Sequence, residues 1–237
     1  RSTLFPYTTL FRSPYSMLKR PQRFLQAIAD EAGIALPPLF ASGLVFLDRD
    51  DAKADVARRR LGAELEREGL RVAGWRRVPT NPEACGAEAL RTLPRIEQVF
   101  VGGDAAQPDE AALNRKLFLV RRRTEKALEA SDRVFYVPSL SASTLVYKGM
   151  VMPRYLAEFY PDLKDPRLES SVVVFHQRFS TNTLPQWRLA HPYRYLAHNG
   201  EINTIQGNRN WAVARGPLFR SPLLYMEIGR ASCRERV

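Results

Sequence analysis

Cysteine and histidine are both scarce in this chain of 237 residues. The two cysteines, Cys85 and Cys233, form no pattern typical of a disulfide framework or a metal-binding site. The three histidines are separated by fifteen and seven positions, a spacing that matches no zinc signature. The sequence therefore predicts neither a metal site nor a fold held together by disulfides.

Long apolar runs are also missing. No run approaches the roughly 20 residues that a membrane-spanning helix needs, and the first residues lack the order of a signal peptide. Hydrophobic residues make up 45% of the chain, which is ordinary for a globular protein, and the length suffices for one large domain. We therefore expect a cytoplasmic protein without a membrane partner.

The two ends of the chain can both be read from one DNA sequence, translated in opposite directions. Residues 3–13 can be encoded by a DNA sequence whose reverse complement encodes residues 228–237. This DNA sequence resembles a sequencing adapter, and chance agreement over so many residues is negligible. We therefore assign residues 1–13 and 227–237 to artefactual ends and residues 14–226 to one genuine segment.

Acidic residues are outnumbered, because 36 lysines and arginines face 25 aspartates and glutamates. The two ends carry +3 of the formal net charge of +11, so +8 belongs to the genuine segment. A basic balance can indicate binding to nucleic acid. Here the arginines alternate with acidic residues along helical patterns, as in LGAELEREG at residues 61–69, which favours a solvated surface.

Apolar spacing and turn residues predict alternating helices and strands. Helices are expected at residues 21–32, 51–68, 84–93, 154–160 and 207–215, with another opened by Pro108. Strands are expected at residues 43–47, 70–78, 96–101, 135–137 and 144–147. Phe118 and Leu119 are interpreted as core positions, and Trp211 as packing against a sheet. Short strands with helices between them indicate an α+β layered domain.

Polar groups suited to chemistry are concentrated in residues 176–211, which contain all three histidines. An apolar β-branched run predicts a buried strand that delivers Arg178 to its end. A polar turn follows, and then a second short strand at residues 193–198 ends in Asn199 and Gly200. Guanidinium, hydroxyl, imidazole and amide groups at neighbouring strand ends suit a small anionic molecule that carries an amide.

Several motifs stand in a fixed order: GWRRVP, KLFLVRRRTEKA, FYVPSLSASTLVYKGM, FYPDL, RFSTNT, LAHPYRYLAHNGEINT and GNRNW. With this order and spacing, residues 14–226 resemble part of the class II glutamine amidotransferase domain of glutamate synthase large subunits. The resemblance implies an N-terminal-nucleophile hydrolase, whose fold is a four-layer αββα sandwich of two mainly antiparallel sheets, here incomplete. It also implies an enzyme that hydrolyses glutamine to glutamate and ammonia for transfer to 2-oxoglutarate.

The resemblance assigns roles to residues of the polar stretch. Asn199 and Gly200 would form the oxyanion hole, whose N–H groups stabilise the charge of the tetrahedral intermediate. Arg178 would bind the α-carboxylate of glutamine through its planar guanidinium. Thr181 and Asn182 would hydrogen-bond the substrate. Without the resemblance, Asn-Gly is equally typical of a tight turn and Arg178 of a structural ion pair.

The resemblance also places His191 at the mouth of the glutamine pocket, whereas His176 and His198 are interpreted as core histidines. The family's nucleophile is a cysteine at the mature N-terminus, whose α-amino group can act as the base. Cys85 does not match it, because it falls within a predicted helix and is interpreted as a small buried residue. We therefore expect the chain to begin downstream of the nucleophile and to be inactive alone.

Cofactors and partners follow from the resemblance as well. FMN and an iron–sulfur cluster belong to later domains of the family, and no cofactor is expected in this segment. The partners implied are glutamine, the remaining domains of the large subunit and a small electron-transfer subunit. This region does not distinguish NADPH, NADH or ferredoxin as the electron donor.

Three rival interpretations stay open. The first is another class II amidotransferase, of the purine-biosynthetic or asparagine-forming kind, against which GEINTIQGNRNW and YKGM argue. The second is a nucleic-acid-binding module built on Arg121, Arg122 and Arg123, which would need a basic face with exposed aromatic residues. The third is a pseudo-enzyme that keeps the pocket for regulation.

Overall fold

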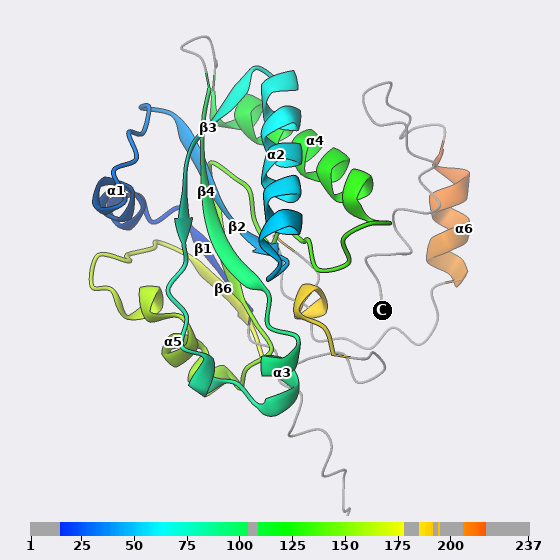
Figure 1. Ribbon diagram of the computed structural model, residues 1–237. Coiled ribbons are helices and arrows are strands. Elements are labelled where there is room, and N and C mark those ends of the chain that lie inside the picture. Colours follow the sequence, from blue (N-terminus) through cyan, green and yellow to red (C-terminus); the bar gives the residue numbers. More distant parts are fainter. Residues whose placement is uncertain (1–14, 104–108, 178–184, 192–193, 195–205, 217–237) are drawn as a thin grey trace, which may run out of the picture.

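Two three-stranded antiparallel sheets form the frame of the protein (Figure 1), whose computed structural model describes residues 15–103, 109–177, 185–191, 194 and 206–216. The first sheet has the order β2-β4-β3, formed by Phe40–Leu47, Arg95–Gly103 and Leu70–Arg77. The second has the order β5-β1-β6, formed by Thr144–Lys148, Tyr15–Lys19 and Val173–His176. These sheets confirm the α+β class and the mainly antiparallel pairing.

Helices stand between groups of strands along the chain. The α-helices are α1 Gln22–Glu31, α2 Asp51–Arg67, α3 Ala87–Arg91, α4 Glu110–Leu128, α5 Leu156–Phe159 and α6 Gln206–Ala214. Short 3₁₀ turns are η2 Pro82–Ala84, η3 Pro153–Tyr155, η4 Pro161–Lys164 and η5 Trp187–Leu189. Among the described residues, no helix is long and apolar enough to cross a membrane.

Strand β2 is buried on both faces because it lies between two apolar cores. Its alternate residues Phe40, Leu44 and Phe46 face the inner core, which also contains Leu145 and Tyr147 of β5. The inner core thus lies between the two sheets, and α1 and α5 add side chains to it. Two faces of burial explain why β2 reads as a nearly continuous apolar run.

The opposite face of β2 and β4 packs against α2 and α4 (Figure 1), which form the outer core. In α2, Ala57, Leu61 and Leu65 are fully buried at a spacing of four, so they lie on one face of the helix. Asp50 caps the start of α2 by accepting a hydrogen bond from the backbone N–H of Lys53. One layer of helices and two layers of sheet are therefore in place.

Three expectations about individual residues are wrong. Phe118 is 46% exposed, because the buried face of α4 runs through Leu113, Leu117 and Val120 instead. Trp211 is 65% exposed, with the guanidinium of Arg215 over its ring at 5.2 Å.

Cys85 was also misplaced by the sequence pattern. It lies in extended backbone, because the expected helix at residues 84–93 is divided into the turn η2 and the short helix α3. Gly86 is the N-cap of α3, so the helix begins after Cys85.

Candidate active site

Of the six residues that the sequence assigns to the site, the structure describes one, His191. The others, Arg178, Thr181, Asn182, Asn199 and Gly200, lie outside the described residues. Their convergence in one cleft therefore stays a prediction. The described residues that flank these positions in the chain still show which contacts surround the candidate site residue His191.

Two histidines bring the end of β6 close to the segment that follows η5. His176 ends β6, two positions before Arg178, and His191 follows the turn η5. Their ring centroids are 4.5 Å apart with an interplanar angle of 39°. His191 is 4% exposed and has a φ of 50°, an uncommon value for a residue with a side chain. The structure thus places His191 in a buried contact with the end of β6.

The turn η5 is anchored to the inner core by Trp187. Its indole N–H donates to the backbone oxygen of Ala89 at 3.1 Å, and its ring packs against Phe46 and Phe159. An aromatic ring of this size contributes a large buried area, and its polar tip is satisfied. The segment that carries His191 is therefore held to the rest of the domain.

Lys148 is a buried polar residue beside this segment that the sequence analysis did not single out. It is 2% exposed, ends β5, and donates from Nζ to the backbone oxygens of Arg188 at 2.7 Å and His191 at 3.3 Å. Its Nζ also lies 4.3 Å from the centroid of the Tyr136 ring. The only sequence signal was its place in the YKGM motif.

A close approach of the backbone brings Tyr136 and the polar SLSAS segment against β2. Isolated bridges join Ser42 to Ser141 and Phe46 to Tyr136. A Cβ atom on Gly43 would lie 1.9 Å from the backbone oxygen of Ser139, so only glycine fits there. The short strand expected at residues 135–137 is therefore an isolated bridge to β2.

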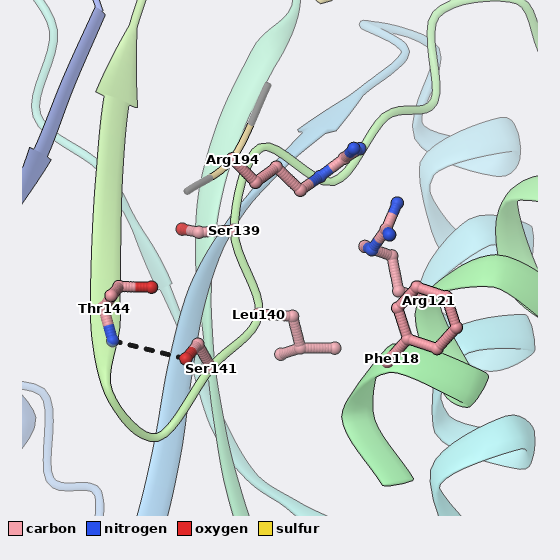
Figure 2. A pocket seen from close by; sticks show the side chains of 7 residues that line it. All are labelled: Phe118, Arg121, Ser139, Leu140, Ser141, Thr144 and Arg194. Carbon is pink, nitrogen blue, oxygen red and sulfur yellow. Dashed lines mark hydrogen bonds between the residues drawn. The ribbon is translucent and has the colours of Figure 1, made fainter. Parts of the chain in front are cut away.

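A small hollow opens beside this segment, on the side of α4 (Figure 2). It is lined by Phe118, Arg121, Ser139, Leu140, Ser141, Thr144 and Arg194. Arg121 and Arg194 both bind the carboxylate of Glu125, at 2.9 and 3.1 Å. The hydroxyl of Ser139 accepts from backbone N–H of Val146, and that of Ser141 from Thr144. These contacts have a structural role, and His191, the one expected site residue that the structure describes, is not part of the lining.

The basic run of α4 is engaged by carboxylates. Arg121 and Arg122 pair with Glu125, and Arg123 pairs with Glu68, which directly follows α2. Arg121 is itself buried. The run thus lacks the exposed basic face that the nucleic-acid interpretation requires.

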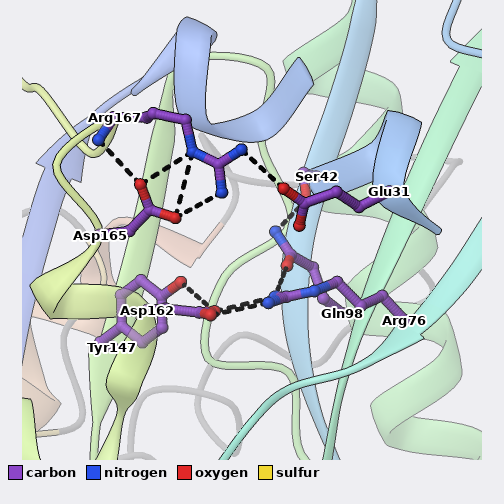
Figure 3. Close-up of polar contacts among 8 residues, drawn as sticks. All are labelled: Glu31, Ser42, Arg76, Gln98, Tyr147, Asp162, Asp165 and Arg167. Carbon is purple, nitrogen blue, oxygen red and sulfur yellow. Dashed lines mark hydrogen bonds and ion pairs between the residues drawn. The ribbon is translucent and has the colours of Figure 1, made fainter. Parts of the chain in front are cut away.

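A buried polar network joins the two sheets (Figure 3). Arg76 of β3 donates to both carboxylate oxygens of Asp162 at 2.7 and 2.8 Å, and the hydroxyl of Tyr147 donates to the same carboxylate at 3.0 Å. Arg76 also binds Gln98, which donates to Ser42 of β2. Burial, and then the neighbouring Asp162, raise the pKa of Tyr147, so its hydroxyl stays protonated and serves as a donor.

Cys85 has none of the features of a nucleophile. Its thiol is partly buried against the inner core, and this burial raises its pKa to about 11. Its backbone N–H donates to Pro82 at 2.9 Å, so its nitrogen is an amide and cannot act as a basic amine. A thiol of this kind is almost entirely protonated at neutral pH.

The described residues do not fit an iron–sulfur cluster. They contain one cysteine, Cys85, and they hold no group of three or more histidine, cysteine or acidic side chains that could bind a metal ion. No chemical step is therefore assigned to a metal within them.

Comparison with known proteins defines the class. A family model described as "Glutamine amidotransferases class-II" matches residues 16–232, which is most of the chain. The chain therefore belongs to the class II glutamine amidotransferases.

Its relatives within this class include glutamate synthases. It is 43% identical over 205 residues to the glutamate synthase [NADPH] large chain of Azospirillum brasilense and 37% identical to that of Bacillus subtilis. The match covers 85% and 86% of this chain, respectively, and 14% of each relative. It is also 44% identical, over 76% of its length and 11% of the relative, to ferredoxin-dependent glutamate synthase 2 of Arabidopsis thaliana. The chain thus spans about one seventh of the bacterial relatives.

Proposed function

We propose that this chain is part of the glutamine-hydrolysing domain of a glutamate synthase, which releases ammonia for transfer to 2-oxoglutarate. The observation that carries the proposal is the family match over residues 16–232. The contact between His176 and His191 supports it, because it joins the segment leading into RFST to the segment leading into HNG. The names of the relatives favour glutamate synthase over the other class II enzymes.

In the proposed mechanism, Arg178 binds the α-carboxylate of glutamine, and Thr181 and Asn182 orient the substrate. Asn199 and Gly200 donate hydrogen bonds to the carboxamide oxygen as it becomes an oxyanion. Donors placed in advance for this charge lower the barrier because they need no reorganisation when the charge develops. Each residue supplies a group whose geometry suits its role.

The nucleophile is proposed to be a cysteine other than Cys85. A thiol whose pKa is about 11 supplies little thiolate, whereas the attack on the carboxamide requires one. FMN and an iron–sulfur cluster are proposed to lie in the remaining domains of the large subunit, and a small electron-transfer subunit is a further proposed partner. The electron donor is left open, since relatives named for NADPH and for ferredoxin both match. The cytoplasmic location stays a prediction.

The proposal is tested on the full-length large chain that carries this segment. Glutamine hydrolysis is followed as ammonia release against glutamine concentration for the parent enzyme, Asn199→Ala and Arg178→Ala. Loss of an oxyanion donor is expected to lower kcat by on the order of a hundredfold with little change in KM. Loss of Arg178 is expected chiefly to raise KM, because it removes a contact with the α-carboxylate.

Arg23→Ala serves as a control, because this arginine lies on α1 with an exposed side chain. Its kinetics should equal those of the parent enzyme. A fully active Asn199→Ala variant would refute the proposed oxyanion hole. A parent enzyme that binds glutamine without hydrolysing it would favour the pseudo-enzyme interpretation instead.

A further inference from the structure

Lys148 is a charged residue in a buried position, where such residues are rare. Its side chain is 2% exposed and lies beside the inner core, where removing an amino group from water is costly unless donors and charge are satisfied. The partners of Nζ include the backbone oxygens of Arg188 and His191 and the ring face of Tyr136. The side chain thus reaches from the end of β5 to backbone 40 and 43 residues further along.

The carbonyl groups that Lys148 binds lie at and after the turn η5. Within the turn, the N–H of Leu189 donates to Gln186 and that of Ala190 donates to Trp187. The last carbonyls of a helical turn need partners from outside the turn. Lys148 supplies such a partner for Arg188 and also for His191, so it caps the end of η5.

The capped segment contains an uncommon backbone conformation. His191 has a φ of 50°, and residues other than glycine keep such a value only where the surroundings hold it. The hydrogen bond from Lys148 to the His191 oxygen acts directly on this residue. The ring of His191 in turn lies 4.5 Å from that of His176, which ends β6.

We propose that Lys148 is a positioning residue for the glutamine site, because its amino group ties the backbone of Arg188 and His191 to β5. This inference rests on the proposed function, and it adds to that function a residue that touches no substrate. Lys148 would act through His191, whose ring contacts that of His176 at the end of β6. Its loss should disturb glutamine binding more than global folding, since Trp187 still anchors η5.

The test uses Lys148→Met and Lys148→Arg in the full-length large chain. Methionine keeps an unbranched apolar side chain and removes the donor, whereas arginine keeps charge and donors on a broader planar head. Because Lys148→Met loses hydrogen bonds from a charged donor, we expect its KM for glutamine to rise about tenfold or more. Lys148→Arg should raise KM by a smaller factor while the unfolding temperature stays near that of the parent enzyme.

Lys53→Met is the matched control, because Lys53 lies on α2 with a side chain 56% exposed. It should leave KM and kcat unchanged. The inference is overturned if the folded Lys148→Met variant binds glutamine with a KM within about twofold of the parent value. It is also overturned if both variants fail to fold, since Lys148 would then serve folding alone. A parent enzyme without glutamine hydrolysis would refute the proposed function instead.

Discussion

Burial decides the chemistry of single residues in this domain, and Cys85 is the clearest case. Its thiol is packed against the inner core, so its pKa is raised from 9.0 to about 11. In a Cys233→Ser background, we expect Cys85 to react with a disulfide reagent at pH 8 roughly a hundredfold more slowly than in urea, because the folded chain supplies less thiolate. The release of coloured thiol over time measures this rate. Equal rates in the two conditions would contradict the burial.

Asp165 shows the opposite direction of shift. Hydrogen bonds from the side chain and backbone of Arg167 lower its pKa from 3.8 to about 2. The charged form therefore stabilises the folded state above about pH 4, and this contribution is lost as the pH falls through about 2.

Asp165→Asn should flatten the dependence of unfolding free energy on pH between about 4 and 2. Urea denaturation at a series of pH values measures this slope. Val56→Ala, at an exposed residue of α2 without an ionisable group, is the control and should keep the parent slope. An unchanged slope in Asp165→Asn would show that this carboxylate is not the one being titrated.

At the scale of elements, the buried network of Figure 3 joins β3 to the turn η4 and β5. Asp162 is almost fully buried and accepts from both Arg76 and Tyr147. Asp162→Ala is expected to lower the free energy of unfolding by about 3 kcal/mol, because the guanidinium of Arg76 would stay buried without its carboxylate. Chemical denaturation measures the loss.

Tyr147→Phe should cost less, about 1 kcal/mol, since it removes one hydrogen bond and keeps the ring. Asp55→Ala is the matched control, because its ion pair with Arg58 has an exposed carboxylate and should contribute at most about 1 kcal/mol. If Asp162→Ala were no more destabilising than Asp55→Ala, the contacts of Asp162 would not contribute to the stability of the packing between the sheets.

Local patterns predicted most elements, because helix caps and apolar spacing are written in adjacent residues. Helix α2 was expected at residues 51–68 and is observed at Asp51–Arg67, where Gly69 ends it with a φ of 70°. Strand β1, Tyr15–Lys19, was not anticipated, since a five-residue strand flanked by polar residues carries little periodicity. The order of strands within each sheet also has no local signal.

In the candidate site, too, some residues could be predicted from the sequence and others could not. The resemblance to a family supplied Arg178, Asn199 and the other assigned residues, because motif order is visible in the sequence. The role of Lys148 could not be predicted from the sequence. Its partners include backbone oxygens 40 and 43 residues away, and a backbone oxygen carries no sequence signature. Contacts of this kind can be found only when the chain is folded.

At the scale of the whole molecule, two apolar cores share β2 and β4. The outer face of the second sheet adds a smaller cluster of Met17, Val146 and Val174. All the buried residues of these cores lie between Met17 and Ala190. The two ends, residues 1–14 and 217–237, lie outside the described residues, so their lack of packing stays a prediction.

The DNA origin proposed for the two ends leads to the last prediction. If residues 1–13 and 227–237 come from adapter sequence, they have no packing partners selected by the fold. Chains of residues 1–237 and 14–226 should then unfold at the same temperature and share a circular dichroism spectrum. A shorter chain that also lacks β1 is the positive control, because β1 pairs with both β5 and β6 and its removal should lower that temperature clearly. A loss of stability in the 14–226 chain, or a genomic locus that encodes both ends, would refute the adapter origin.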